Sequence, residues 1–237
     1  MSDEPPTRKR MVRPPSGGAE AGRVIPARLK TAWKRTPSQQ AWLSRQINDP
    51  FAAKARAHGY RSRAAYKLTE LDDRFHFLKR GARVIDLGLA PGGWTQVAIE
   101  RGVVQIAGVD LLAVDPLAPA QILQMDFTDP QCGAQLIGLL GGAPDLVMSD
   151  MAPNTVGHRQ TDHLRIVGLI EAAVDFAVDV LKPGGSFIAK AFQGGETAEV
   201  IAKLKRHFSS VKTVKPKASR SDSSELYLIA TGFKGLI

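Results

Sequence analysis

Strand-like and helix-like segments alternate along most of this chain, and this alternation is the feature that most constrains its fold. Apolar runs of strand length occur at 83–88, 104–110, 121–127, 145–150 and 186–192. Helical patterns lie between or after them, at 93–101, 130–140, 162–181 and 196–208. A helix between two strands forces those strands to pair in parallel. The sequence therefore predicts an α/β domain with a mainly parallel sheet and helices on both faces.

The two ends of the chain depart from this pattern. Near the C-terminus, two strand-like runs at 211–216 and 225–233 are separated by a polar loop without a helix, which permits antiparallel pairing. We therefore expect seven strands, one of them antiparallel. Residues 1–37 are rich in Pro, Gly and Arg and have no hydrophobic period, so we expect a disordered tail before a single domain at 38–237.

Composition narrows the class of protein further. No run of eighteen apolar residues exists, and the N-terminus lacks the apolar region of a secretory signal. Cys132 is the only cysteine, which excludes an internal disulfide and a cysteine-based zinc cluster, and the five histidines show no ligand-like spacing. We expect a cytoplasmic monomer without a membrane partner and without a metal.

The positive charge is concentrated at the N-terminus. Residues 1–67 hold fifteen Lys and Arg against four Asp and Glu, whereas 68–237 hold seventeen against nineteen. A basic arm on a near-neutral domain is typical of a polyanion binder, most simply of a nucleic-acid binder, although a short basic tail can also serve only solubility. Basic residues continue into 54–67, which has a helical appearance, with Ser62 as a plausible N-cap for the helical pattern at 61–75.

The segment "VIDLGLAPGGW", residues 84–94, has the form of a strand followed by a nucleotide-binding turn. It differs from the dinucleotide motif GxGxxG because Ala90 and Pro91 stand in its middle. Asp110 lies 22 residues after Gly88, at the spacing of an acid that binds the ribose of NAD. However, Ala90 obstructs close approach of a pyrophosphate and Pro91 removes an N–H donor. The turn favours a nucleoside cofactor without phosphates, such as S-adenosylmethionine (AdoMet), and leaves NAD as the alternative.

Charged residues also stand at or near the ends of five strand-like runs: Asp86, Asp110, Asp126, Asp150 and Lys190. In open α/β sheets, ligands bind outside the carboxyl ends of the strands. We therefore expect most of these side chains to surround a binding site. For Asp86 we expect a supporting role, in which its carboxylate braces the glycine turn through backbone N–H groups.

Four segments together resemble the FtsJ/RlmE family of RNA 2′-O-ribose methyltransferases: "DLGLAPGGW", "VMSDMAPN", "LKPGGSFIAKAFQG" and "ELYLIATG". The upstream "GYRSRAAYKL" is similar to that family as well, and the likeness extends from about Ser38 to Lys234. It implies a Rossmann-like AdoMet-dependent methyltransferase fold. It also implies methyl transfer from AdoMet to a uridine ribose in the 23S RNA of the large ribosomal subunit.

The resemblance implies site residues by motif. The family's Lys-Asp-Lys-Glu tetrad corresponds to Lys67, Asp150, Lys190 and Glu225. The implied cofactor contacts are Gly92, Trp94, Asp110, Asp126 and Asp150. The chain departs from the family pattern at Leu89, often an alanine, and in the loop before Glu225, which is less basic than expected.

A 2′-hydroxyl is a poor nucleophile until a positioned base removes or shares its proton. Lysine can act as that base when burial or a neighbouring cation destabilises its charged form, so we expect Lys67 to lie near Lys190, with the two acids orienting both amines. Three alternatives stay open: a methyltransferase for transfer RNA or another RNA, an NAD(P) oxidoreductase, and an RNA-binding protein on an inactive methyltransferase fold.

Overall fold

The computed structural model describes residues 36–37, 40, 43–44, 47–152, 159–194 and 197–235, with the backbone alone for 159–164 and 197. Residues 49–237 form one compact unit, to which all elements named below belong. Its helices are α2 (Pro50–Ala57), α3 (Ala65–Phe75), α4 (Gly93–Glu100), α5 (Cys132–Leu140), α6 (Arg159–Val180) and α7 (Thr197–His207). Its strands are β1 (Arg83–Leu87), β2 (Gln105–Asp110), β3 (Gln121–Gln124), β4 (Leu146–Ser149), β5 (Ser186–Phe192), β6 (Phe208–Val214) and β7 (Glu225–Phe233).

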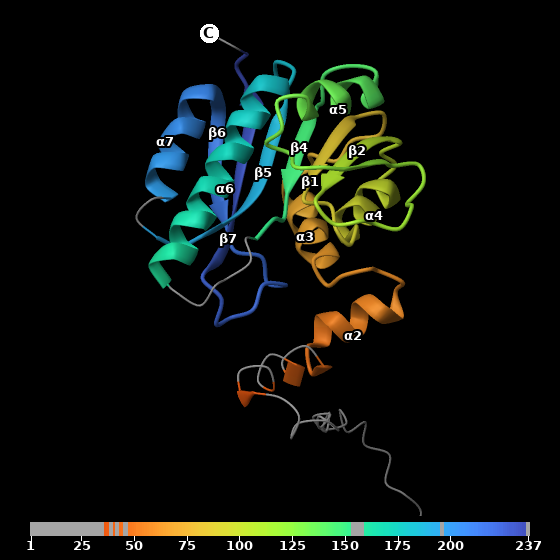
Figure 1. The fold of residues 1–237 in the computed structure, drawn as a ribbon, viewed down its shortest axis with the longest axis vertical. Coiled ribbons are helices and arrows are strands. Elements are labelled where there is room, and N and C mark those ends of the chain that lie inside the picture. Colours follow the sequence, from red (N-terminus) through yellow and green to blue (C-terminus); the bar gives the residue numbers. More distant parts are fainter. Residues whose placement is uncertain are drawn as a thin grey trace, which may run out of the picture. The chain divides into compact units, whose positions relative to one another are not determined.

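The seven strands form one sheet in the order β3-β2-β1-β4-β5-β7-β6 (Figure 1). The first five pair in parallel, and β7 runs antiparallel to both of its neighbours, β5 and β6. The predicted fold class, a mainly parallel seven-stranded sheet with one antiparallel strand near the C-terminus, is confirmed. The strand order reverses between β1 and β4, which is where open sheets of this kind bind ligands.

Helices cover both faces of the sheet and make two separate apolar cores. One core joins α5, α6 and α7 to inward residues such as Ile85 and Phe187. The other joins α3 and α4 to the opposite face of the same strands, through residues such as Val84, Ile188 and Tyr227. Since successive side chains of a strand point to opposite faces, Lys190 shares the α3/α4 face with Ile188, two residues away.

The same alternation puts Glu225 and Asp150 on the α3/α4 face. Glu225 lies two residues before Tyr227, and Asp150 lies two residues after Met148, which belongs to the core of that face. The pairing of β5 with β7 sets Lys190 opposite Tyr227. Strand register therefore directs three of the four tetrad side chains toward α3, the helix that carries the fourth.

The segment before α3 differs from the prediction. The helix expected at 54–67 is interrupted, because α2 ends at Ala57 and Gly59 adopts a φ of 74°, a left-handed conformation that ends helices. The predicted N-cap, Ser62, is also wrong: Ala64 occupies the cap position of α3 without a side-chain bond. Ser62 instead packs against Gly93, where an added Cβ would lie 2.3 Å from its Oγ.

Two strand boundaries also differ. The sequence predicted helix up to Phe208 and a strand from Val211, but β6 begins at Phe208, because Phe208 pairs with Phe233 across the sheet and their rings lie 5.3 Å apart. Strand β3 ends at Gln124 instead of continuing to Phe127. In the described part of the chain, no helix is long and apolar enough to cross a bilayer.

The burial of Leu68 in α3 leads to a prediction about the free energy of unfolding. Leu68 is fully buried between α3 and the sheet, whereas Leu112 is 66% exposed. We expect Leu68→Ala to lower the free energy of unfolding by about 2–5 kcal/mol, because it leaves a cavity in a close-packed core. Leu112→Ala should change it by about 0.5 kcal/mol or less. Denaturant unfolding of both variants measures the difference, and equal losses would contradict the packing described for α3.

Candidate active site

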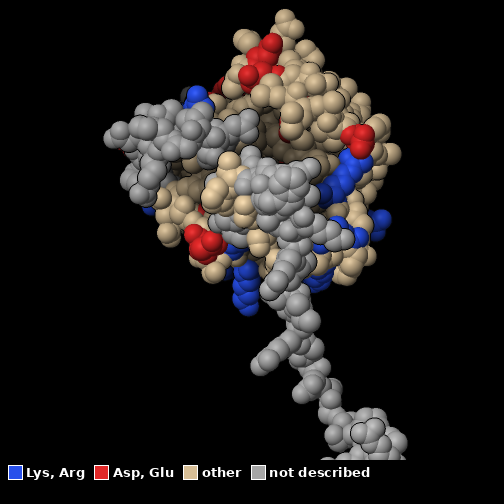
Figure 2. All heavy atoms as spheres, turned by 60° about the horizontal axis from the view of Figure 1, so that its bottom comes forward, with Lys and Arg blue, Asp and Glu red and all other residues tan. Residues whose placement is uncertain are grey.

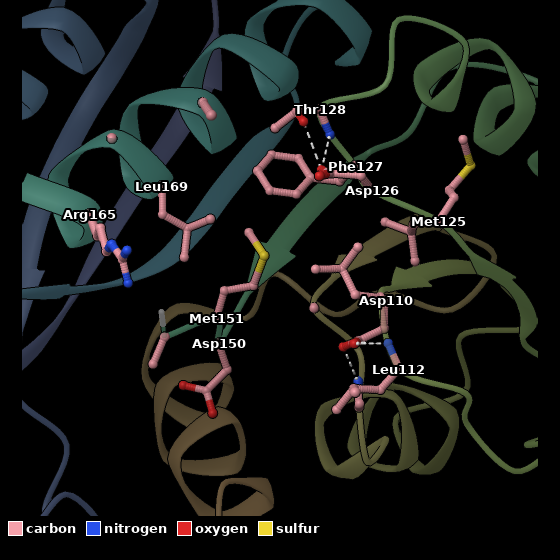
Figure 3. A pocket seen from close by; sticks show the side chains of 17 residues that line it. Asp110, Leu112, Met125, Asp126, Phe127, Thr128, Asp150, Met151, Arg165 and Leu169 are labelled. Carbon is pink, nitrogen blue, oxygen red and sulfur yellow. Dashed lines mark hydrogen bonds between the residues drawn. The ribbon is translucent and has the colours of Figure 1, made fainter. Parts of the chain in front are cut away.

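A cavity of about 960 Å³ opens at the carboxyl ends of β1, β2, β3 and β4 and is closed on one side by α6 (Figure 3). Its size is in the range of pockets that hold nucleotide-sized ligands. Asp110, Asp126 and Asp150 line it together with the glycine turn and with apolar side chains such as Leu112 and Met151. Three of the predicted site residues therefore surround one cavity. Arg165 of α6 lines it from the opposite wall.

The first glycine of the turn, Gly88, cannot be replaced by a residue with a side chain, because of its backbone conformation and its close packing against Met151. Gly88 has a φ of 71°, and a Cβ there would lie 2.0 Å from Cγ of Met151. A substituted residue would be strained and would force Met151, which lines the cavity, to move. The sequence motif is thus explained by backbone geometry and by close packing.

Asp110 is bonded to the turn itself. Its Oδ2 accepts a hydrogen bond from the backbone N–H of Ala90 at 2.8 Å, and its Oδ1 accepts one from Leu112 at 2.8 Å (Figure 3). Asp86, which we expected to brace the turn through backbone N–H groups, instead accepts a hydrogen bond from the Thr95 hydroxyl at 2.6 Å. Among the described residues the bracing of the Ala90 amide is therefore done by Asp110.

Asp126 lies on the cavity wall beside α5. Its Oδ1 accepts hydrogen bonds from the backbone N–H and the hydroxyl of Thr128, at 2.9 and 2.7 Å. These two bonds hold its pKa below the usual range, so the carboxylate is ionised at neutral pH. The wall that carries Asp110 and Asp126 can accept hydroxyl hydrogen bonds from a ligand.

The four tetrad residues come together beside this cavity. Lys67 Nζ lies 2.7 Å from Glu225 Oε1, and Lys190 Nζ lies 3.2 Å from Asp150 Oδ1. Lys190 also donates to the backbone carbonyl of Asp150 at 2.5 Å. Their side chains are between 9% and 19% exposed. Asp150 belongs to both groups, because it pairs with Lys190 and also lines the cavity.

The hydroxyl of Tyr227 connects the two ion pairs, a contact that the sequence analysis missed. It donates to Asp150 Oδ1 at 2.6 Å and lies 3.2 Å from Glu225 Oε1. Burial and the two carboxylates raise the pKa of Tyr227 well above its usual value, so the hydroxyl keeps its proton and remains a donor. The available signal was its place two residues after Glu225 in one strand, which puts both side chains on one face.

Glu225 is held ionised by its neighbours. Burial opposes its ionisation, but the charge and hydrogen bond of Lys67, the hydroxyl of Ser219 (2.8 Å) and the charge of Lys190 together keep its pKa below the usual value. Both lysine charges therefore act on the same carboxylate, which indicates that the two ion pairs form one electrostatic unit.

Gly92 and Trp94 do not line the cavity. Trp94 is 3% exposed, its indole N–H donates to the backbone carbonyl of Ala64 at 3.0 Å, and its ring lies 5.7 Å from that of Tyr227. Its side chain joins the start of α3 to β7. Gly92 has a φ of 107° and precedes α4.

Arg61 and Arg63, which belong to the basic run at the N-terminus, are bonded to the protein itself. The Arg61 guanidinium donates to the backbone carbonyls of Pro91, Asp115 and Pro116 at 2.9–3.2 Å. Arg63 pairs with Asp49 and donates to the carbonyl of Ala218. These side chains hold loops around the site, so their charge cannot be counted as free surface charge.

Metal ligands are not grouped in this part of the molecule. Among the described residues, no three His, Cys, Asp or Glu side chains are arranged to hold a metal ion. His158 lies outside the described residues, and of His163 only the backbone is described.

The parallel sheet with one reversed strand, the cavity at the strand reversal and the lysine–carboxylate pairs beside it together define a Rossmann-like methyltransferase. The profile of FtsJ-like methyltransferases matches residues 60–233. The chain belongs to the FtsJ-like methyltransferase family.

Individual relatives agree with this assignment. The chain is 74% identical over 225 residues to "Ribosomal RNA large subunit methyltransferase E" of Caulobacter sp. (strain K31), covering 95% of this chain and 100% of that protein. It is 59% identical to the protein of the same name from Gluconobacter oxydans (strain 621H), over 92% of this chain and 82% of that protein. Among solved structures, a Plasmodium falciparum protein described as a ribosomal RNA methyltransferase superposes with a TM-score of 0.68 at 32% identity, over 75% of this chain and 100% of that chain.

Asp86 supplies a pH-dependent prediction. It is 1% exposed, and burial, partly offset by the hydrogen bond from Thr95, raises its pKa to about 7. The folded protein therefore keeps a proton on Asp86 up to about pH 7, whereas the unfolded chain loses it near pH 4. Between these values the unfolded state binds fewer protons, so the free energy of unfolding must decrease as pH rises.

Asp86→Asn, which cannot ionise, should lack this part of the decrease. We expect the variant to gain stability relative to the wild type by a few kcal/mol in order of magnitude between about pH 4 and 7, with no further gain above that window. Thermal or denaturant unfolding at a series of pH values measures it. Asp222→Asn, at an exposed position, is the control. Parallel pH curves for wild type and Asp86→Asn would contradict the burial of an ionisable carboxyl at this position.

Proposed function

We propose that this protein transfers a methyl group from AdoMet to the 2′-oxygen of a uridine ribose in 23S ribosomal RNA of the large ribosomal subunit. The main support for this proposal is that Asp150 both lines the cavity and pairs with Lys190 in the tetrad. A cofactor in the cavity and an acceptor hydroxyl at the tetrad would meet at this residue. The names of the relatives from Caulobacter and Gluconobacter support the substrate class.

The cavity suits AdoMet better than a phosphate-bearing cofactor. Asp110 already accepts the N–H of Ala90, so the turn presents a carboxylate where a pyrophosphate would need free donors. A cationic ligand with ribose hydroxyls is complementary to the carboxylates of Asp110, Asp126 and Asp150. In this proposal Asp110 and Asp126 bind the hydroxyl and adenosine groups of AdoMet, and Gly92 and Trp94 support the turn. The NAD(P) alternative is disfavoured on the same ground.

Bound AdoMet supplies an electrophilic methyl on a sulfonium sulfur. The ammonium of Lys190 would first have to release a proton; its amine would then take the proton from the 2′-hydroxyl as the oxygen–carbon bond forms and the carbon–sulfur bond breaks, leaving neutral S-adenosylhomocysteine. Asp150, 3.2 Å away, stabilises the ammonium that forms on Lys190. Lys67 and Glu225 orient the acceptor ribose and balance the charge. No step requires a metal.

RNA would approach at the end of the molecule that Figure 2 turns toward the viewer, where Lys and Arg side chains lie along parts of the described surface. We propose that residues 1–37 form a basic tail that raises the local concentration of RNA, attached to a methyltransferase domain at 38–237. A ribosomal RNA substrate also agrees with a cytoplasmic enzyme, and we propose that it acts as a monomer. Ribosomal RNA is preferred over transfer RNA because of the relatives' names.

Methyl transfer with isotopically labelled AdoMet tests the function directly. Total RNA, transfer RNA and isolated small and large subunits from cells that lack this protein serve as acceptors, and nucleosides from the product are separated. We expect label in large-subunit RNA as 2′-O-methyluridine. Label on a base or in transfer RNA would contradict the proposal, and label in no RNA would favour an RNA-binding protein on an inactive fold.

Lys190→Ala should abolish turnover while leaving AdoMet affinity within about threefold of the wild type. The side chain pairs with Asp150, but it does not line the cofactor cavity. Loss of a positioned base typically costs about 10²–10⁴-fold in rate. Turnover and calorimetric AdoMet affinity are measured on the same preparation. Lys182→Ala, which removes an exposed lysine paired with Asp145, is the matched control. Residual turnover above about a tenth of wild type would remove Lys190 from the role of base.

Asp110→Asn should weaken AdoMet binding by about 1–3 kcal/mol, because an amide cannot accept at both positions and leaves a backbone N–H or a ribose hydroxyl without its partner. RNA affinity should stay unchanged. Asp115→Asn, on an exposed residue of the following loop, removes the same charge without touching the cavity. Cofactor affinity unchanged in Asp110→Asn would show that Asp110 only supports the turn.

A further inference from the structure

Asp49 lies outside the tetrad and the cofactor cavity, yet it is one of the few buried acids of the described chain, at 6% exposed. Its Oδ1 accepts the backbone N–H groups of Phe51 and Ala52 at 3.0 and 3.2 Å and so caps α2. Its Oδ2 accepts hydrogen bonds from Arg63 and from Arg220, whose Nε and Nη2 lie at 3.2 and 3.1 Å. One carboxylate thus has two tasks, a helix cap and a charge partner for two guanidinium groups.

The two arginines reach Asp49 from different parts of the chain. Arg63 lies just before α3, four residues before Lys67, and Arg220 lies in the loop between β6 and β7. Arg63 also donates to the carbonyl of Ala218 in that loop. A second tie comes from Glu70 of α3, whose carboxylate accepts the N–H groups of Lys217 and Ala218 at 2.9 and 3.2 Å. The loop is therefore fixed to the α2–α3 region, and α2, α3 and this loop lie toward the same end of the sheet in Figure 1.

The same loop reaches the tetrad through Ser219. Its hydroxyl donates to Glu225 Oε1 at 2.8 Å, and that oxygen pairs with Lys67 at 2.7 Å. A closed ring of contacts follows, from Asp49 through Arg63 and α3 to Lys67, and from there through Glu225 and Ser219 back to Arg220. The ring defines where Lys67 and Glu225 stand relative to each other.

In this ring a single carboxylate, that of Asp49, balances the charges of two arginines. Arg63 and Arg220 share the single carboxylate of Asp49, and the Arg63 side chain is only 16% exposed. Its Nε is buried without a partner among the described residues, so this guanidinium is poorly solvated. Burial and the nearby charge of Arg220 both lower the pKa of Arg63 and so disfavour its charged form. Without Asp49, two partly desolvated cations would repel each other and separate the loop from α3.

We infer that Asp49 is a positioning residue for methyl transfer: through Arg63 and Arg220 it holds the loop at 215–224 against α3 and thereby sets the Lys67–Glu225 pair. This inference rests on the proposed function, since it concerns the same reaction. Asp49 then affects the rate of the chemical step, and Arg63 and Arg220 have a structural role, because they hold the loop at 215–224 against α3.

Asp49→Asn tests the inference, because asparagine still caps α2 but carries no charge. We expect kcat to fall about tenfold or more, as small displacements of positioned groups do. AdoMet affinity and the KM for large-subunit RNA should stay within about threefold, because neither the cavity nor the surface charge outside the ring is altered. Asp73→Asn is the matched control, since it removes an acid of α3 from an exposed ion pair with Arg101, outside the ring, and should keep the wild-type kcat.

The double variant Asp49→Asn/Arg220→Gln separates positioning from a general loss of stability. Removing Arg220 removes the repulsion, so the double variant should have a kcat within about threefold of that of Arg220→Gln alone, whereas independent effects would multiply the two single losses. If Asp49→Asn does not fold, this double variant and Arg63→Gln, which should lose kcat because it breaks the tie to Ala218, decide the question. Wild-type kcat in Asp49→Asn, or losses that multiply in the double variant, would overturn the inference. Failure of the proposed function would look different, since the wild-type protein itself would then not methylate RNA.

Discussion

Two carboxylates and two amines are enclosed at one end of the sheet, and the hydroxyl of Tyr227 is bonded between the carboxylates. Charges with so little solvent around them are tolerated only when each has a partner of opposite sign and its remaining hydrogen-bonding positions are filled. Glu225 meets this condition through Lys67, Ser219 and Tyr227. The requirement for complete pairing explains why so many other contacts, from Trp94 on α4 to the loop after β6, converge on this end of the molecule.

The sheet makes this cluster possible through its topology. Parallel strands with helix crossovers bring the carboxyl ends of β1, β2 and β4 to one edge, where the cavity lies. The reversed strand β7 then enters beside β5 and brings Glu225 and Tyr227 to the same edge from the opposite direction, in register with Phe192 and Lys190. A parallel strand at that place would carry its last residues there instead of its first. The antiparallel pairing is thus a condition for a tetrad built from both ends of the domain.

The sequence was sufficient for the fold class, because that follows from local patterns, whereas the four tetrad positions were implied by the resemblance to the FtsJ/RlmE family. Alternating strand and helix periods define the parallel sheet, and Lys190 stands out as a charge within an apolar strand. Contacts between distant loops have no such local sign. Arg61 belongs to the basic run at 54–67, but its partners are the carbonyls of Pro91, Asp115 and Pro116, and backbone acceptors cannot be predicted from side-chain types.

Ser62, which does not cap α3, and Asp49 illustrate the same limit of prediction from sequence. Ser62 fits a capping pattern, yet close packing against Gly93 decides its place. Asp49 fits a capping pattern as well and does cap α2, but its second task depends on two arginines that are 14 and 171 residues away in the chain. Tertiary contacts override or extend local preferences wherever loops meet, and here the loops meet at the site.

We propose that the cavity and the tetrad form one site, joined at Asp150. A crystal structure of the protein with S-adenosylhomocysteine, the product of the transfer, tests it most directly. We expect the nucleoside to lie in the cavity with its ribose hydroxyls toward Asp110 and its sulfur directed past Asp150 toward Lys190. A product bound elsewhere, or one in the cavity with its sulfur turned away from Lys190, would contradict it.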